Sequence, residues 1–122
     1  MYPFTSYVKL QQAYISESGT VFGNYTIIGY STPGQNSKTT NFDFTEATRT
    51  WKENTATLST TAATNAWQAK SLVKLNDCDA QSVWSISVAA STTNAGEATF
   101  TPVLPTDTDC AALTPSYKQI GK

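Results

Sequence analysis

Residues 3–18, with the sequence PFTSYVKLQQAYISES, contain the pattern that determines the architecture. Side chains suited to burial recur there at steps of three and four residues, and polar side chains fill the positions between them. The first set comprises Phe4, Tyr7, Val8, Gln11, Tyr14 and Ile15, whereas Lys9, Gln12, Ser16 and Glu17 face away. Because Pro3 suits a first turn and Gly19 a left-handed stop, the pattern predicts one amphipathic helix.

Two later segments have the two-residue period of strands that bury one face. In residues 67–75 the odd positions are Trp67, Ala69, Ser71, Val73 and Leu75, and the even ones include Gln68, Lys70 and Lys74. In residues 83–89 the side chains of Trp84, Ile86 and Val88 alternate with those of Ser85 and Ser87. Both segments are predicted to be antiparallel strands with one solvated face.

Composition and turn residues mark the other strands. Residues 98–103 follow the turn Asn94-Ala95-Gly96 and are predicted to form a hairpin with the strand around Trp84. Residues 25–30, 41–44 and 50–54 are strand candidates with weaker boundaries, because they are rich in Thr and aromatic residues and are bounded by turn formers. We expect residues 57–65 to be an exposed loop.

These elements predict a single α+β domain over residues 1–122, in which the amphipathic helix packs on an antiparallel sheet. We expect the helix in residues 1–19, a connecting loop with short strands in residues 20–56, and the main sheet with the C-terminal tail in residues 66–122. The predicted helix–sheet core consists of Phe4, Tyr7, Val8, Tyr14, Ile15, Trp67, Val73, Trp84, Ile86 and Val88.

The charge pattern argues against nucleic acid as a partner. Charged residues make up 14% of the chain, the formal net charge is −1, and 8 basic residues are scattered among 9 acids. Nucleic-acid binding normally requires Lys and Arg clustered on one face. The abundance of Ser, Thr, Asn and Gln is instead typical of extracellular proteins.

The two cysteines, Cys78 and Cys110, support the same compartment. An isolated pair in a polar, charge-poor chain is typical of a structural disulfide in an exported protein, and we predict that bond. The alternative is two unpaired core thiols. Aspartates flank both cysteines, and a free thiol in such polar surroundings would be exposed and labile.

A bond between the cysteines would also draw Asp77, Asp79, Asp107 and Asp109 into one neighbourhood. Calcium prefers carboxylate oxygens, so these four residues are a candidate calcium site. The alternative is that they serve turns and strand ends and point into water, which is a common role of Asp. We expect no other cofactor.

The inventory of reactive side chains argues against catalysis. The chain has no histidine, which is the side chain that most readily transfers protons near neutral pH and the commonest metal ligand. The best enzymatic alternative is a glycosidase-like carboxylate pair drawn from Asp43, Glu46, Glu53 and the aspartates near the cysteines, but any nine acids offer such pairs. We therefore expect a protein that is not an enzyme.

Aromatic residues raise a second hypothesis, a carbohydrate-binding or adhesive surface module. Trp67 and Trp84 fall on the apolar faces of their strands and are expected in the core. Trp51 lies among polar neighbours in Arg49-Thr50-Trp51-Lys52-Glu53 and is the candidate ligand contact. On this hypothesis the partner would be a polysaccharide surface.

Five segments follow one another in a recognisable order: Tyr7-Val8-Lys9-Leu10-Gln11-Gln12-Ala13-Tyr14, Ile28-Gly29-Tyr30, Trp67-Gln68-Ala69, Leu75-Asn76-Asp77-Cys78, and Cys110 with Leu113-Thr114-Pro115. Together with the cysteine spacing they resemble the head domains of type IV pilins and pseudopilins. The chain departs from that family at its start, Met1-Tyr2-Pro3-Phe4, where the prepilin signal and the apolar half-helix of a pilin are not present. We interpret the sequence as a pilin-like head without that half-helix.

The resemblance implies a structural subunit that acts by assembly in an extracellular filament or in the periplasm after export. It implies that the full-length form is anchored in the membrane before assembly and contacts other subunits through the apolar half-helix. It further implies that the disulfide closes a C-terminal region of the head. The expected assembly surfaces are the outer helix face with Lys9, Gln12 and Glu17, and the loop of residues 22–38.

Overall fold

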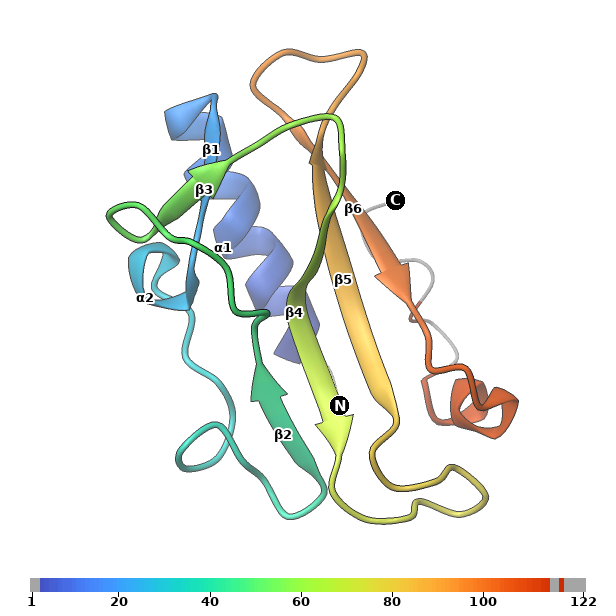
Figure 1. The fold of residues 1–122 in the computed structure, drawn as a ribbon. Coiled ribbons are helices and arrows are strands. Elements are labelled where there is room, and N and C mark those ends of the chain that lie inside the picture. Colours follow the sequence, from blue (N-terminus) through green and yellow to red (C-terminus); the bar gives the residue numbers. More distant parts are fainter. Residues whose placement is uncertain (1–2, 115–116, 118–122) are drawn as a thin grey trace.

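The computed structural model describes residues 3–114 and 117, and it has the predicted α+β class (Figure 1). Met1 and Pro115, named above, lie outside these residues. The elements follow in the order α1 (Pro3–Ser18), β1 (Val21–Gly23), α2 (Tyr25–Ile28), β2 (Phe42–Thr45), β3 (Thr55–Thr57), β4 (Ala63–Ser71), β5 (Val83–Ala90), β6 (Ala98–Val103) and the 3-10 helix η1 (Thr108–Leu113).

The helix α1 lies behind the strands and forms the second layer of the fold (Figure 1). Its predicted inner stripe is buried at Phe4, Tyr7, Val8, Gln11 and Ile15 and half-buried at Tyr14, whereas Lys9, Gln12, Ser16 and Glu17 are exposed. The helix stops as predicted, since Gly19 has a φ of 75° and its N–H donates to the Ile15 carbonyl at 2.7 Å. Within residues 3–114 and 117, no helix is both long and apolar enough to cross a membrane.

The strands form a four-stranded antiparallel sheet in the order β2-β4-β5-β6 and a separate antiparallel pair, β1-β3. The predicted hairpin between residues 83–89 and 98–103 is confirmed, because β5 pairs with β6 and Val88 lies opposite Phe100. The pair β1-β3 lies beside the upper part of the main sheet, on the same side of the molecule as α2 (Figure 1).

Trp67 on β4 is the centre of the contact between the helix and the sheet. Its side chain is fully buried, its ring meets the edge of the Phe4 ring at 5.9 Å between centroids, and its Nε1–H donates to the Tyr30 hydroxyl at 3.0 Å. Phe44 on β2 packs on its other side, at 6.0 Å. Of the predicted core residues, all are buried except Tyr14, which is half-buried, and Val73.

The prediction of Val73 as a core residue is wrong, since its side chain is 42% exposed. The strand that was expected over residues 67–75 ends at Ser71. There the Ser71 hydroxyl donates to the Asp79 carbonyl at 3.1 Å, and Leu75 pairs with Cys78 across a tight turn. Apolar and polar residues continue to alternate beyond Ser71, although the chain leaves the sheet there. For this reason the two-residue period predicted wrongly that Val73 is buried.

The prediction of a strand over residues 25–30 is also wrong. The segment forms the short helix α2, whose N-cap Asn24 accepts from the Ile27 N–H at 3.0 Å. At its other end Gly29 has a φ of 79° and closes the turn. Local capping therefore prevails over the strand preference of the β-branched residues within the segment.

Two further boundaries are shifted. Residues 50–54 were expected to be a strand, but Glu53 and Asn54 have positive φ and form the turn between Lys52 and Thr55, so β3 begins only at Thr55. Residues 57–65 were expected to be a loop, yet β4 already begins at Ala63. The register in which β4 pairs with β5 shifts between Ala63 and Trp67, and this irregularity interrupts the two-residue period that would indicate a strand in the sequence.

The face of β5 that carries Ser85 and Ser87 was predicted to be solvated, but these two side chains are only 5% and 7% exposed. β5 lies between β4 and β6, and Gln68 and Val103 are the residues opposite Ser85 on the two neighbouring strands. Small side chains in a central strand are covered by longer neighbours even when their face has no helix on it.

A buried polar contact attaches β1 to α1. Gln11 is fully buried, and its Nε2 donates to the Gly23 carbonyl at 2.7 Å while its Oε1 accepts from the Gly23 N–H at 2.9 Å. The same Nε2 lies 3.0 Å from the Tyr7 hydroxyl, to which it donates. The side-chain amide thus pairs with a backbone peptide group as a neighbouring strand would, and it satisfies both polar groups of Gly23 away from water.

Replacing Gln11→Ala should lower the free energy of unfolding by about 3 kcal/mol, because two buried backbone groups lose their partners and each such loss costs about 1–3 kcal/mol. The matched control is Gln12→Ala, one position along the helix, where the side chain is exposed; its effect should stay within about 0.5 kcal/mol. Urea unfolding monitored by tryptophan fluorescence measures both. Equal effects of the two variants would contradict the role given to the Gln11 amide.

Candidate functional site

The lower end of the molecule is closed by a disulfide between Cys78, in the β4–β5 loop, and Cys110, in η1. Both cysteines are fully buried and are separated by 32 residues in the sequence. The predicted bond is therefore confirmed, and the alternative of two free thiols is excluded. In the loop-entropy model, a closure of this length stabilises the fold by about 3–4 kcal/mol.

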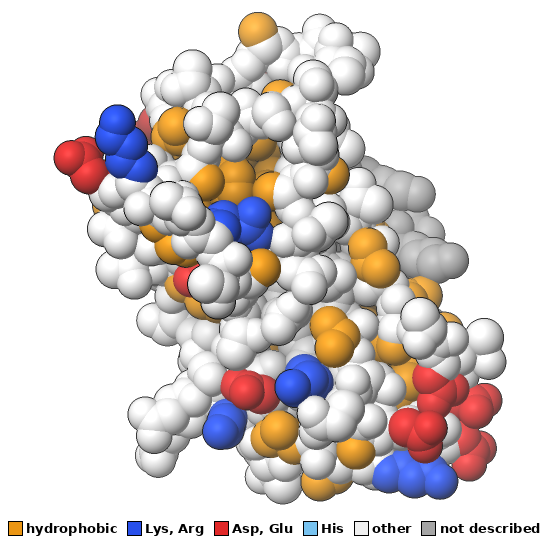
Figure 2. Space-filling view, viewed as in Figure 1, with side chains coloured by type: hydrophobic (Ala, Val, Ile, Leu, Met, Phe, Trp, Pro, Cys, Tyr) orange, Lys and Arg blue, Asp and Glu red, His pale blue; other side chains and the backbone are white. Residues whose placement is uncertain are grey.

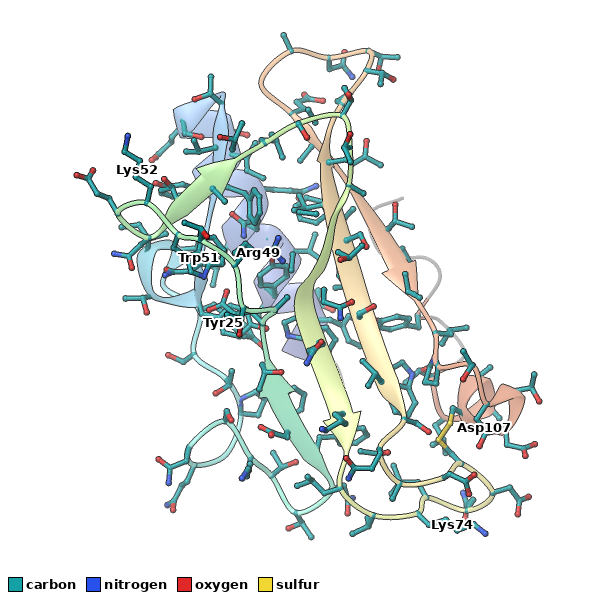
Figure 3. All side chains as sticks on the ribbon, in the orientation of Figure 1. Tyr25, Arg49, Trp51, Lys52, Lys74 and Asp107 are labelled. Atoms are coloured by element: carbon teal, nitrogen blue, oxygen red, sulfur yellow. A yellow bond between two sulfur atoms is a disulfide. The ribbon has the colours of Figure 1, made fainter. Side chains whose placement is uncertain are left out.

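Asp107 acts as a structural cap beside the disulfide (Figure 3). Its Oδ1 accepts from the Asp109 N–H at 3.0 Å, which caps η1, and its Oδ2 accepts from the Asp79 N–H at 3.2 Å in the β4–β5 loop. One carboxylate thus holds together the two segments that the disulfide joins.

The candidate calcium ligands lie in the same end of the molecule, where acidic side chains gather over η1 and the β4–β5 loop (Figure 2). Asp77, Asp79 and Asp109 are exposed, and Asp107 is half-buried. Across residues 3–114 and 117 the side chains of His, Cys, Asp and Glu form no group of three that could hold a metal ion. The calcium site stays a prediction, to be tested together with the role of Asp107.

Trp51, the predicted ligand contact, is half-buried in the loop between β2 and β3. Its ring meets the Phe22 ring edge-on at 5.7 Å, and the Arg49 guanidinium carbon lies 5.5 Å from the Trp51 ring centroid and 5.4 Å from that of Phe22. These distances are those of cation–π contacts. Trp67 and Trp84 are fully buried, as expected, so neither offers a stacking surface.

Arg49 connects the loop to the main sheet. Its Nη2 donates to the Thr64 carbonyl at 2.7 Å, next to the irregular part of β4, and the nearby Ala47 N–H donates to the Asn65 carbonyl at 3.0 Å. Among the residues that the structure describes, the buried Nε of Arg49 has no hydrogen-bond partner. In the space-filling view hydrophobic side chains surround basic atoms at the place where Figure 3 labels Arg49 (Figures 2 and 3). Arg49 and Trp51 therefore fill the gap between the two sheets.

A shallow, open depression of about 580 Å³ lies below this cluster. Its lining comes from three places in the sequence: α2 and the segment after it (Tyr25, Thr26, Tyr30, Ser31 and Thr32), the tight turn at Asn36 and Ser37, and the end of β2 (Phe44, Thr45 and Glu46). The lining is rich in hydroxyl groups and contains three aromatic rings and one carboxyl group. Polar side chains from several elements converge on the depression, which is one feature of ligand sites.

Glu46 is held in place by the N-terminus of α2. Its Oε1 and Oε2 lie 3.2 and 3.3 Å from the Tyr25 backbone nitrogen, whose N–H donates to them. Burial raises the pKa of the Glu46 carboxyl, whereas the bond from the Tyr25 N–H and the positive charge of Arg49 act in the opposite direction. A carboxyl group that is partly removed from water and fixed in orientation is a candidate contact for a polar ligand.

The tyrosines beneath the depression form a rigid floor. The rings of Tyr25 and Tyr30 meet edge to face at 4.8 Å, and Tyr7 of α1 packs against both, at 5.8 and 5.7 Å. The Tyr25 hydroxyl donates to the Thr45 carbonyl. Burial raises the pKa of the Tyr7, Tyr25 and Tyr30 hydroxyls, so all three stay neutral near pH 7.

Sequence reasoning did not find this depression. Glu46 was considered only as one of several acids available for a carboxylate pair. Tyr25 and Tyr30 were assigned to a strand within the expected assembly loop of residues 22–38, and Tyr30 also belongs to a segment that resembles pilins. The one available signal was the Asn24 cap followed by Gly29, which marks a short helix and hence a turn in the chain. Nothing in the sequence indicated that Tyr25 and Glu46, 21 positions apart, would be in contact.

No protein-family model, curated protein or solved structure matches the chain. The chemistry of the site is therefore argued from its own residues.

Replacing Asp107→Ala should lower the free energy of unfolding by about 1–2 kcal/mol, because it removes a helix cap and a contact between two loops. Asp109→Ala is the matched control, since that exposed side chain makes no such contact. Melting curves recorded in about 5 mM calcium, which exceeds the Kd of weak calcium sites, and in excess chelator test the calcium site in the same experiment. A melting temperature that does not respond to calcium would dispose of the calcium site, and equal effects of the two variants would contradict the cap.

Replacing Glu46→Gln should raise the melting temperature at pH 7. The raised pKa means that the folded state binds the Glu46 proton more tightly than the unfolded chain does. The stability that protonated Glu46 contributes is therefore fully present below the pKa of the unfolded chain, and it is lost as the pH rises through the pKa of the folded protein. Glutamine does not ionise, so the variant does not lose this stability.

The difference between wild type and Glu46→Gln should accordingly shrink as the pH falls toward about 3, below the ordinary pKa of Glu. Glu97→Gln, at an exposed position, controls for the change of net charge. A Glu46→Gln variant that is less stable than wild type at pH 7 would show instead that the attraction to Arg49 outweighs burial.

Proposed function

We propose that this chain is the head of a structural subunit of a type IV pilus or a related pseudopilus, and that it acts by assembly and surface display. The observation that carries the proposal is the architecture: a four-turn N-terminal helix laid across a four-stranded antiparallel sheet, with a disulfide that ties the C-terminal segment to the β4–β5 loop. This combination agrees with what the resemblance of the sequence to pilin heads implies.

The distribution of polar and apolar side chains supports an assembly role. The outer face of α1 carries Lys9, Gln12 and Glu17 together with Leu10, which is 36% exposed. In the loop of residues 22–38, Ile27 on α2 is 42% exposed. Each of these two faces thus combines an exposed apolar side chain with polar neighbours. Protein interfaces likewise have an apolar centre and a polar rim.

In this proposal the partners are further copies of the same subunit, in a filament outside the cell or in the periplasm. The resemblance implies that the main contact is an apolar helical segment continuous with α1, whose burial drives assembly. The exposed side chains of α1 and α2 then decide how neighbouring heads are placed. No chemical reaction is required of the subunit.

Immunogold electron microscopy of the source cells with an antibody against residues 3–114 tests the proposal. We expect gold particles along surface filaments, and we expect the antigen in the fraction released by shearing. A strain from which the gene has been deleted is the control for specificity. An antigen confined to the cytoplasm, or a cell surface without labelled filaments, would overturn the proposal.

A further inference from the structure

The depression beside α2 is not explained by filament assembly. Its rim carries the side chains of Thr26, Ser31, Thr32 and Asn36, and these form no hydrogen bond with residues 3–114 or 117. Other hydroxyls of the lining are already engaged: the Ser37 hydroxyl donates to Asp43 Oδ1 at 2.7 Å, and Thr45 Oγ1 accepts from Gln68 at 2.7 Å. The groups that remain available for a ligand are thus concentrated on one rim.

The position of Asn36 is fixed by the backbone. Asn36 and Ser37 have φ values of 53° and 68°, and they form the tight turn between Gln35 and Lys38, whose backbone groups exchange two hydrogen bonds of 3.0 Å. The backbone that carries the Asn36 side chain is therefore held in a tight turn, and Asn36 is among the residues that line the depression.

Glu46 supplies a second polar anchor, at the N-terminus of α2. Its two carboxylate oxygens accept from a single backbone N–H, so lone pairs on both oxygens remain free to accept from a ligand. Two adjacent hydroxyl groups on a ring present donors at the spacing of the two oxygens of one carboxylate. Such bonds to an ionised group are roughly twice as strong as those between neutral partners.

The aromatic lining of the depression is largely buried. It consists of Tyr25, Tyr30 and Phe44, of which Tyr30 and Phe44 are only 7% and 2% exposed, so these rings offer a ligand little apolar surface. No Lys or Arg is among the described residues that line the cavity, and the one charged group is an acid. The Glu46 carboxylate repels a phosphate, a sulfate or an acidic sugar that is placed against it.

From these features we infer that the depression binds a neutral saccharide, with Glu46 and Asn36 holding ring hydroxyls. The volume of about 580 Å³ is within the range of small-molecule sites and accommodates two to three sugar units. Because the depression is open, we expect weak binding, with a Kd of about 1 mM. The site is separate from Trp51, and the inference does not depend on filament assembly.

Titration of the ¹⁵N-labelled protein with lactose, maltotriose, N,N′-diacetylchitobiose and sialyllactose tests the inference by NMR. We expect at least one of the three neutral sugars to shift the amide signals of Thr26, Ser31 and Asn36. Sialyllactose should bind no more tightly than lactose. Absence of shifts with every sugar, shifts confined to another surface, or a preference for sialyllactose would each overturn the inference.

Two variants show whether the assigned side chains are responsible. Glu46→Gln removes the charge, and Asn36→Gly removes the amide while it preserves the positive φ of the turn. Each should weaken binding about tenfold, the equivalent of about 1.4 kcal/mol, and a well-dispersed NMR spectrum shows that each is folded. Glu97→Gln should leave the affinity unchanged. Unaltered binding by both Glu46→Gln and Asn36→Gly would overturn the site, whereas the microscopy of the source cells would be unaffected by either result.

Discussion

The pairing of the Gln11 amide with the peptide group of Gly23 is the contact on which the upper half of the molecule depends. It fixes β1 against α1, and β1 in turn carries β3 and leads directly into α2. The close approach leaves no room for a side chain at position 23, because a Cβ there would lie 2.2 Å from Ile27 Cγ2. One buried polar side chain thus determines where α2 lies and, with it, the tyrosine floor of the depression.

The two ends of the molecule are secured in different ways. At one end a covalent bond and the Asp107 carboxylate hold the β4–β5 loop to η1. At the other end the loop between β2 and β3 is held by Arg49, which contacts two aromatic rings and a carbonyl of β4. The candidate site lies between these anchored regions, on α2, the end of β2 and the connecting segment between them. Such connecting segments, positioned by a scaffold, commonly carry binding sites.

Periodicity predicted the parts of the fold that repeat, and it failed where a single residue changes the direction of the chain. The helix over residues 3–18 and the strand around Trp84 were recognised because burial on one face imposes a period over many positions. The strand around Phe100 was recognised from the turn Asn94-Ala95-Gly96 that precedes it. The strand expected at residues 25–30 became a helix through one cap, and the exposure of Val73 follows from a turn at Ser71.

The candidate site was harder to predict than the fold for a related reason. Trp51 was singled out from its polar neighbours in sequence, but its neighbours in space are Phe22 and Arg49. Glu46 acquires its role only by meeting the backbone of Tyr25, a contact that depends on how α2 is placed. Residue types can suggest such contacts, but only the folded chain brings them together.

The disulfide also determines how the molecule responds to a pulling force. β5 and β6 both lie between Cys78 and Cys110, inside the covalently closed loop. Tension applied between α1 and a point beyond Cys110 would pass through the sulfur–sulfur bond and not along the backbone of these two strands. The 32-residue separation corresponds to roughly 110 Å of chain that cannot be drawn out, so the bond limits how far the molecule can extend before a covalent link must break.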